Sequence, residues 1–126
     1  MDRLEIILEP GLYAVIRGAL PLPRTAVEDG RLRADLAAAG ERSALLPEEE
    51  IPPGVTAERG WRWLRVAGPF DFEAVGIIAP IASALAGARV PIFVLSTFDT
   101  DHVLVKERDL ERAIAALRGA GYDVRE

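Results

Sequence analysis

The sequence contains no cysteine and only one histidine among its 126 residues. The absence of cysteine excludes disulfide bonds and thiolate metal sites, and a single histidine does not supply a site that needs several imidazole ligands. The chain also lacks a Gly-rich phosphate-binding loop and any run of about 20 apolar residues that could span a membrane. We therefore expect no dinucleotide or P-loop cofactor, no metal and no membrane-spanning segment.

An excess of basic residues is missing as well. Lysine and arginine total 15 against 20 acidic residues, which gives a net charge of −5, and the acids are not gathered in a long tail. Nucleic-acid-binding surfaces need a basic patch and anionic membranes attract basic segments, so we expect neither partner. The first residues, with Asp2 and a short apolar run, make a poor signal peptide, which predicts a cytoplasmic protein.

No catalytic set is recognisable. The only histidine, His102, has no cysteine partner, and no Gly-flanked serine motif accompanies it. A lone histidine at the start of a strand is more often structural than a catalytic base. The spacing of Asp99, Asp101 and Glu107 matches no known magnesium or calcium loop. We therefore expect that the protein is not an enzyme.

The second half of the chain alternates strand-like and helix-like patterns. Residues 61–67 have the length and composition of a strand, ended by Gly68 and Pro69. A helix that ends at Gly87 is predicted by apolar residues at three- and four-residue spacing. These residues are Val75, Ile78, Ala82 and Leu85.

Residues 90–98 are apolar at almost every position, which predicts a strand buried on both faces. Residues 102–106 alternate apolar and polar, and residues 122–125 form a short last strand. Between them a second helix, closed by Gly119 or Gly121, carries the apolar stripe Leu110, Ala113, Ile114 and Leu117. The resulting order, βαββαβ, predicts an α+β, ferredoxin-like fold with both helices on one face of an antiparallel sheet.

The first half is less regular. Residues 4–8 and 12–17 predict a hairpin that turns at Pro10 and Gly11. Residues 32–39 are helical by propensity, but a strand at 31–36 is expected if this half is a degenerate copy of the second, and we prefer the strand. The other elements of the copy are short helices at 24–28 and 48–51 and strands at 42–46 and 55–59. The predicted domains are residues 1–60 and 61–126.

Two tryptophans in the strand at 61–67 predict an interface. Trp61 and Trp63 point to the side of the strand opposite Leu64 and Val66. If the two aliphatic residues face the helices, the indole rings lie on the other face, where their exposure would leave a large apolar area in water. We therefore expect the first half or a second subunit to cover them.

Two corners hold the groups able to bind a ligand. A helix start near residues 71–76 would present unpaired N–H groups to a carboxylate, and Gly76 would let a ligand approach. The alternative is that Gly76 allows close packing and Asp71 caps the helix. Pro80 should kink this helix or delay its regular part. At residues 96–101, hydroxyls and carboxylates could accept from an ammonium group, and the alternative is an ordinary polar turn.

The segments GPFDFEAVGI (68–77) and FVLSTFDTDHVLVKERDLERA (93–113) closely resemble the ACT-domain family. The nearest branch comprises small two-domain bacterial ACT proteins related to aspartokinase regulatory domains and to the animal cytosolic arginine sensors called CASTOR. The resemblance covers residues 61–124. It implies tandem ACT subdomains that hold an amino acid between subdomains or subunits and thereby change their association with a partner protein, with a homodimer or a regulatory protein as partner.

The resemblance also implies which residues bind the ligand. In the arginine-sensor branch, residues that match Thr97, Phe98 and Asp101 line the pocket, opposite a helix start matching Asp71, Ala74 and Ile78. The sensors have an acid where this chain has Ala74, so arginine specificity does not transfer, and Ala74 and Pro80 favour the alternative of a ligand-free interaction scaffold. The predicted ligand-binding set is Asp71, Phe72, Ala74, Val75, Gly76, Ile77, Ile78, Ser96, Thr97, Phe98 and Asp101.

Overall fold

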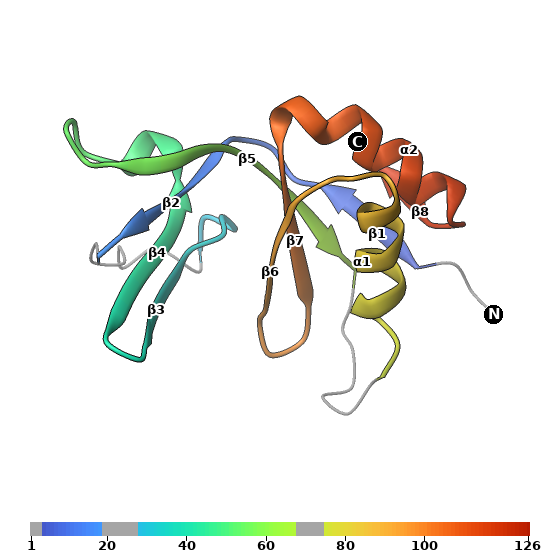
Figure 1. Cartoon of the computed structure of the whole chain (residues 1–126), viewed down its shortest axis with the longest axis horizontal. Helices are drawn as coiled ribbons and strands as arrows, with labels where there is room; N and C mark the ends of the chain where they lie inside the picture. The colour runs from blue at the N-terminus through green and yellow to red at the C-terminus, as the bar shows by residue number, and fades with distance from the viewer. Residues whose placement is uncertain (1–3, 19–27, 68–74) are drawn as a thin grey trace. The chain divides into compact units, whose positions relative to one another are not determined.

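A computed structural model describes residues 4–18, 28–67 and 75–126 (Figure 1). Contacts divide the chain into two compact units. The N-terminal unit is Gly11–Trp61, and the C-terminal unit combines Met1–Pro10 with Arg62–Glu126. The division therefore falls between Trp61 and Arg62, and it places the first ten residues with the second half of the chain rather than with the first.

The C-terminal unit follows the predicted βαββαβ order after one additional strand at its start. Its elements are β1 (Glu5–Leu8), the last residues of β5 (Ala57–Val66), α1 (Ile78–Gly87), β6 (Ile92–Ser96), β7 (Asp101–Lys106), the 3-10 turn η2 (Glu107–Asp109), α2 (Leu110–Gly119) and β8 (Asp123–Arg125). Both helices contribute side chains to one core cluster with the same face of the sheet, which confirms the α+β, ferredoxin-like prediction.

The strand β1 is inserted into the sheet of the C-terminal unit, so the strand order is β6-β7-β5-β1-β8. Ile6 pairs with Val66 of β5 in antiparallel register and with Val124 of β8 in parallel register. The amide of Glu9 also donates to the carbonyl of Trp63 at 2.9 Å. The predicted hairpin between residues 4–8 and 12–17 is therefore wrong, because the first strand finds long-range partners on both of its edges.

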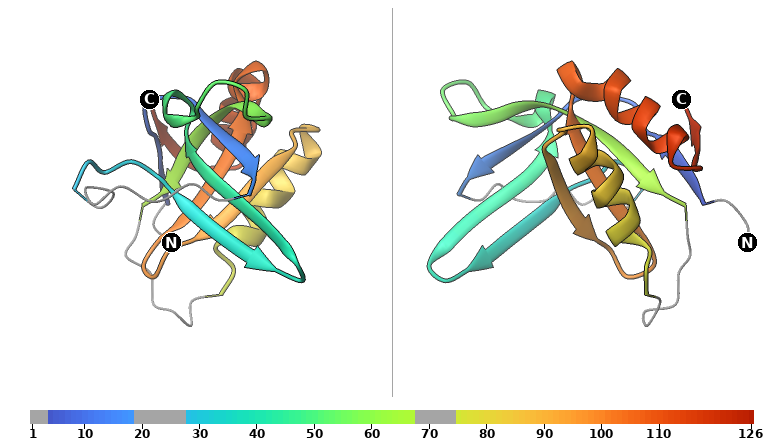
Figure 2. Two further views of the ribbon diagram at one scale, coloured as in Figure 1. Left: turned by 90° about the vertical axis from the view of Figure 1, so that its left-hand side faces the viewer. Right: turned by 45° about the vertical axis from the view of Figure 1, so that its right-hand side comes forward.

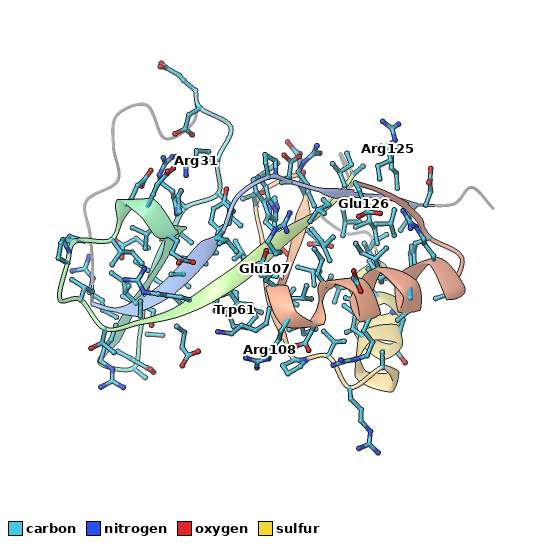
Figure 3. The ribbon with its side chains drawn as sticks, turned by 90° about the horizontal axis from the view of Figure 1, so that it is seen from above. Arg31, Trp61, Glu107, Arg108, Arg125 and Glu126 are labelled. Carbon is cyan, nitrogen blue, oxygen red and sulfur yellow. The ribbon has the colours of Figure 1, made fainter. Side chains whose placement is uncertain are left out.

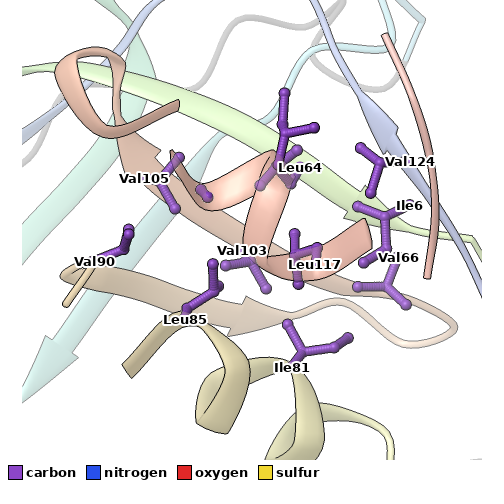
Figure 4. Packing of buried hydrophobic residues seen from close by; sticks show 12 residues of the cluster. Ile6, Leu64, Val66, Ile81, Leu85, Val90, Val103, Val105, Leu117 and Val124 are labelled. Carbon is purple, nitrogen blue, oxygen red and sulfur yellow. The ribbon is translucent and has the colours of Figure 1, made fainter. Parts of the chain in front are cut away.

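The core of the C-terminal unit lies between the sheet and the two helices, as Figure 4 shows. Leu64 and Val66 face the helices as the alternation of β5 predicts, and the stripe predicted for α2 is buried at three of its four positions. The buried side chains of this cluster are Ile6, Leu64, Val66, Ile81, Leu85, Val90, Val103, Val105, Ala113, Ile114, Leu117 and Val124.

The helix α1 begins at Ile78, after the position at residues 71–76 that the sequence predicts. Pro80 explains the late start, because it is the third residue of the helix. In the first three positions the N–H group has no intrahelical acceptor, so a proline there removes no hydrogen bond. The delay predicted from Pro80 is confirmed.

The buried face of α1 is formed by Ile81 and Leu85, with Ile77 and Ile78 partly buried beside them. Val75 precedes the helix and is 90% exposed, so its predicted place on the apolar face is wrong. The true stripe keeps the predicted three- and four-residue spacing but is set by the later helix start.

The C-terminus of α1 is closed by a residue in the left-handed conformation. The amide of Val90 donates to the carbonyl of Leu85 and the amide of Arg89 to that of Ala86, both at 3.0 Å. These are the two bonds of a Schellman motif, in which Arg89 has a φ of 60°. The helix α2 ends in the same way, with Gly121 at the corresponding position and a φ of 99°.

Arg89→Gly is expected to raise the free energy of unfolding by about 0.5–1 kcal/mol. A left-handed L-residue costs about 1–2 kcal/mol, and the larger entropy of glycine in the unfolded chain offsets part of the gain. Urea denaturation of the two proteins measures the difference. Arg89→Ala removes the same side chain but keeps the Cβ, so an equal gain in that control would contradict this explanation.

The burial of β6 and β7 is the reverse of what the sequence predicts. The sequence predicts that residues 90–98 are buried on both faces, but β6 is only partly buried and Val94 is 38% exposed. Within the described part of the chain β6 pairs with β7 alone, whereas β7 has β5 and β6 as neighbours and is buried from His102 to Val105. An apolar run does not show whether a strand lies at the edge or in the middle of a sheet.

The N-terminal unit is built from antiparallel strands. Its elements are β2 (Tyr13–Arg17), β3 (Ala34–Ala38), β4 (Glu41–Pro47), the 3-10 turn η1 (Glu48–Glu50) and the first residues of β5. Its strand order is β3-β4-β2-β5. One cluster of buried residues in this unit consists of Ala14, Ile16, Ala44, Leu46 and Ile51.

The strand preferred over a helix in the first half is confirmed, at Ala34–Ala38 instead of the predicted residues 31–36. β3 pairs with β4 from Ala34–Leu45 to Ala38–Glu41. Ala39 and Gly40 between them both have positive φ, 51° and 79°, as a two-residue hairpin of type I′ requires. Pairing in the hairpin thus overrides the helical propensity of the alanines.

The two units share a strand order. The N-terminal unit has the order β3-β4-β2-β5, and the C-terminal unit has the order β6-β7-β5-β8 when the inserted strand β1 is left out. If the four strands of each order are numbered along the chain, both orders read second, third, first, fourth. η1 occupies the place of the second helix in the N-terminal unit. This order supports the prediction that the first half is a degenerate copy, which stays a prediction. The short helix expected at residues 24–28 lies largely outside the described residues.

An ion cluster joins η1 to the segment before β3. Arg33 contacts two carboxylates, with its Nε donating to Glu50 Oε1 at 2.9 Å and its Nη1 to Asp29 Oδ1 at 3.0 Å. The hydrogen bond from Arg33 lowers the pKa of Asp29 to about 2. Arg31, which Figure 3 shows beside η1, pairs with Glu49. The cluster therefore ties the approach to β3 to the turn that follows β4.

Candidate functional site

Both predicted corners belong to the C-terminal unit, and their described parts lie at the same end of it. In Figures 1 and 2 the hairpin between β6 and β7 and the first turn of α1 lie at the end where β6 finishes and β7 begins. Asp71, Phe72 and Ala74, predicted for the first corner, lie outside the described residues. The described residues of this corner are Val75, Gly76, Ile77 and Ile78.

Gly76 is required by the backbone rather than by close packing. Its φ is 76°, and a Cβ added to it would meet no other atom within 4 Å. Among the described residues, nothing packs closely enough against Gly76 to support the alternative that it allows close helix packing. Ile77 and Ile78 are partly buried and pack against the core with their side chains.

The start of α1 offers amide donors without a side-chain cap. Ile77 is the N-cap residue and has no polar group with which to accept from the first turn. The amides of Ile77, Ile78 and Ala79 precede the first intrahelical bond, and Pro80 has no N–H. Such a helix start favours an anionic group near it, because the helix dipole adds positive charge at the same place.

The second corner is a closed hairpin. The backbone of Thr97 and that of Thr100 exchange two hydrogen bonds, at 2.9 and 3.4 Å. The hydroxyl of Ser96 donates to Oδ1 of Asp101 at 2.5 Å. Phe98, beyond them at the tip, is 79% exposed. All four residues predicted for this corner thus lie in one hairpin, with the carboxylate of Asp101 already oriented by Ser96.

His102 connects this hairpin to the interior. Its Nε2 lies 2.8 Å from Oγ1 of Thr97, and its Nδ1 accepts a hydrogen bond from the indole Nε1 of Trp63 at 3.1 Å. An indole nitrogen only donates, so Nδ1 carries no proton and the neutral ring carries its proton on Nε2. The Nε2–H group therefore donates to Thr97. His102 is 4% exposed, in accord with the structural role predicted for it.

Trp63 is buried within the single chain at 5% exposure, with its ring centroid 5.6 Å from that of His102. Its burial is therefore no evidence for a second subunit, although Trp63 does lie on the face predicted for it, opposite Leu64. The sequence did not reveal the bond to His102, which joins residues 39 positions apart. One feature of the sequence did point to it: Trp63 precedes the helix-facing Leu64, and His102 precedes the core residue Val103, so both side chains belong on the opposite face of the sheet.

Burial of His102 lowers the pKa of its imidazole, and the charge of Arg65 lowers it further, while Asp101 acts in the opposite direction. The unfolded chain consequently binds the proton at a higher pH than the folded chain. The stability contributed by the neutral His102 ring is fully present above its unfolded pKa near 6.5. It is lost as the pH falls from there toward the lower pKa of the folded chain. The protonated ring could no longer accept the hydrogen bond from Trp63.

We expect the free energy of unfolding to fall between pH 7.5 and 5.5, by at most about 1.4 kcal/mol per pH unit from this one proton. Urea denaturation across this range measures the slope. His102→Gln should remove the part of the slope due to imidazole, since the chain has no other histidine. An unchanged slope in that variant would show that His102 does not cause it.

A separate open groove of about 460 Å³ lies in the N-terminal unit, lined by Gly11, Leu12, Arg31, Glu48, Glu49 and Arg59. It contains none of the residues predicted to bind a ligand. Among the described residues, no three His, Cys, Asp or Glu side chains gather closely enough to hold a metal ion. In that same part of the chain, no helix is long and apolar enough to cross a membrane.

The model of the ACT domain family matches residues 56–119, just over half of the chain. The chain belongs to the ACT domain family. Protein Atu0741 from Agobacterium tumefaciens has a crystal structure similar to this ACT protein over 99% of this chain and 94% of its own, with 31% sequence identity and a TM-score of 0.84.

Two further proteins are similar to part of this chain or to its fold. The human "Cytosolic arginine sensor for mTORC1 subunit 1" is 41% identical over 59 residues, which are 46% of this chain and 18% of the sensor. This chain therefore matches less than a fifth of the sensor's length. The ligand-free regulatory subunit of aspartate kinase from Thermus thermophilus has a TM-score of 0.61 over 91% of this chain and 95% of its own. At 13% identity, that likeness shows the fold alone.

Proposed function

We propose that this ACT protein is a regulatory module without catalytic activity that binds a free amino acid and thereby changes its association with a partner protein. The binding site is the end of the C-terminal unit that holds the first turn of α1 and the β6–β7 hairpin. The observation that carries the proposal is an uncapped helix start at the same end as a hairpin that bears Thr97 and Asp101.

The two corners complement the two charges of an amino acid. The amides of Ile77, Ile78 and Ala79 would bind the carboxylate, favoured by the helix dipole. The carboxylate of Asp101 and the hydroxyl of Thr97 would accept from the ammonium group, in charge-assisted hydrogen bonds. The Ser96 hydroxyl occupies one oxygen of Asp101, and the other oxygen serves the ligand.

The relatives support a regulatory role of this kind. One relative is named as an arginine sensor, and a protein that shares the fold is named as the regulatory subunit of aspartate kinase. The name of the arginine sensor does not transfer arginine specificity to this chain, because Ala74 stands where the arginine sensors have an acid. The proposal therefore does not specify the side chain of the ligand. It specifies only that the two corners bind the carboxylate and the ammonium group.

Thermal unfolding in the presence of each of the twenty amino acids, at millimolar concentration, tests the proposal. A ligand at a hundred times its dissociation constant adds about 2.7 kcal/mol, which raises the Tm by several degrees in a chain of this size. We expect at least one amino acid to produce such a rise and Asp101→Asn to abolish it.

Asp99→Asn is the matched control, because Asp99 is an exposed carboxylate in the same hairpin outside the predicted set. It should leave the rise in Tm unchanged. A chain that responds to none of the twenty amino acids, or whose response survives Asp101→Asn, would rule out the proposed site.

A second candidate function is a ligand-free interaction scaffold. The observation in its favour is that the hairpin satisfies its own polar groups, with Ser96 bonded to Asp101 and Thr97 to His102. Such a corner is stable without a ligand. Sedimentation without any amino acid separates the two: a stable dimer with no thermal response to the panel favours the scaffold.

A further inference from the structure

We propose that His102 is a positioning residue of the amino-acid site, which fixes the hydroxyl of Thr97 as a hydrogen-bond acceptor for the ligand's ammonium group. The inference rests on the proposed function and extends it from the hairpin to a buried pair behind the hairpin. Its basis is the continuous chain of hydrogen bonds from Trp63 through His102 to Thr97.

Only one tautomer and orientation of the His102 imidazole makes both hydrogen bonds. Trp63 donates to Nδ1, so the proton must be on Nε2, the nitrogen that faces Thr97. The other tautomer would place an N–H group against the indole N–H and lose the bond from Trp63, and a flipped ring would place carbon atoms where the two nitrogens lie and lose both bonds. At 4% exposure, no bulk water is available to replace them.

The direction of the Thr97 hydroxyl follows from its two hydrogen bonds. Oγ1 accepts from His102 at 2.8 Å and donates to the carbonyl of Thr100 at 3.3 Å. A hydroxyl has one hydrogen and two lone pairs, so one lone pair remains. Because the hydrogen is occupied by Thr100, Thr97 can only accept from a third group, and an ammonium group only donates.

Without the bond from His102, this hydroxyl could rotate and present its hydrogen to a cation, which is repulsive. His102 thus makes Thr97 selective for a cationic donor while remaining out of reach of the ligand itself. The ring also stays neutral in this arrangement, so it does not add positive charge beside the ammonium site. The Asp101 carboxylate, held by Ser96, then supplies the charge that attracts the ligand.

Two substitutions separate the two hydrogen bonds of the ring. His102→Asn places an amide oxygen near the position of Nδ1 and keeps the acceptor for Trp63, but its side chain is too short to reach Thr97. His102→Gln extends an amide N–H to the position of Nε2 and restores the donor to Thr97. A merely structural histidine would not distinguish these variants by their affinity for a ligand.

The experiment is isothermal titration with whichever of the twenty amino acids gives the largest thermal rise with the wild-type chain. Loss of one hydrogen bond to a charged ammonium group corresponds to an affinity loss of about ten- to hundredfold. We expect this loss for His102→Asn and for Thr97→Val, and an affinity within twofold of the wild type for His102→Gln. The double variant that combines His102→Asn with Thr97→Val should bind no more weakly than Thr97→Val alone, because His102 acts through Thr97.

Wild-type affinity in a folded His102→Asn variant, or independent losses in the double variant, would overturn this inference alone. Failure of the wild-type chain to bind any of the twenty amino acids would overturn the proposed function and this inference with it. If His102→Asn does not fold, ¹⁵N chemical shifts of the wild-type imidazole still decide: a proton on Nδ1 contradicts the inference, and a proton on Nε2, together with a weakened Thr97→Val, supports it.

Discussion

Leu85→Ala should lower the free energy of unfolding by about 2–5 kcal/mol. Leu85 is fully buried on α1 and belongs to the same core cluster as Val90 and Val103, shown in Figure 4. The substitution removes three carbon atoms from a cluster whose other members are fixed by the sheet, so a cavity remains. A domain of this kind is stable by only about 5–15 kcal/mol, and urea denaturation followed by circular dichroism would show the loss directly.

The control for this variant is Ser83→Ala, on the same helix but at an exposed position. It should change stability by less than about 0.5 kcal/mol, because surface substitutions remove little packing. A Leu85→Ala variant as stable as Ser83→Ala would mean that α1 does not pack on the sheet as described.

Arg33→Ala should lower the free energy of unfolding by about 2–3 kcal/mol. The Arg33 side chain is 4% exposed, and its loss leaves the carboxylates of Asp29 and Glu50 side by side without their common cation. Breaking a fully buried ion pair costs about 3–5 kcal/mol, and the expected loss is smaller because both carboxylates remain about 30% exposed and can be hydrated.

The matched control is Arg42→Ala, which breaks the ion pair with Asp35 at 3.1 Å. The Arg42 side chain is 58% exposed, so this pair should contribute less than about 1 kcal/mol. Arg33→Lys retains the charge but not the forked donor geometry, and should lose an intermediate amount. Equal losses from Arg33→Ala and Arg42→Ala would show that the cluster around Arg33 behaves as an ordinary surface pair.

Local patterns were sufficient to predict the βαββαβ order, because apolar spacing and glycines mark each helix and strand of the second half. The place of β1 could not be predicted in this way. Residues 5–8 lie beside a Pro-Gly dipeptide that favours a local hairpin, and their true partners, β5 and β8, are about 60 and 120 positions away. No local signal distinguishes a strand that pairs at such a distance from one that turns back.

The polar hairpin of the candidate site was found from sequence because its hydroxyls and carboxylates follow one another directly from Ser96 to Asp101. The bond between Trp63 and His102 was not, since it depends on two strands becoming neighbours in a particular register. The start of α1 was predicted too early because Asp71 and Gly76 resemble a cap, whereas the later Ile78 start places Pro80 where its missing N–H has no effect.

The insertion of β1 between β5 and β8 has a consequence for synthesis of the chain on the ribosome. Residues 5–8 are made well before residues 123–125, so one edge of β1 stays unpaired until about 115 further residues have been added. In the described part of the N-terminal unit, by contrast, β2, β3, β4 and the first residues of β5 pair within residues 11–61 and can fold while translation continues. Until β8 has been made, the apolar strand β1 must be kept from pairing elsewhere, and such delayed closure is typical of slowly folding topologies.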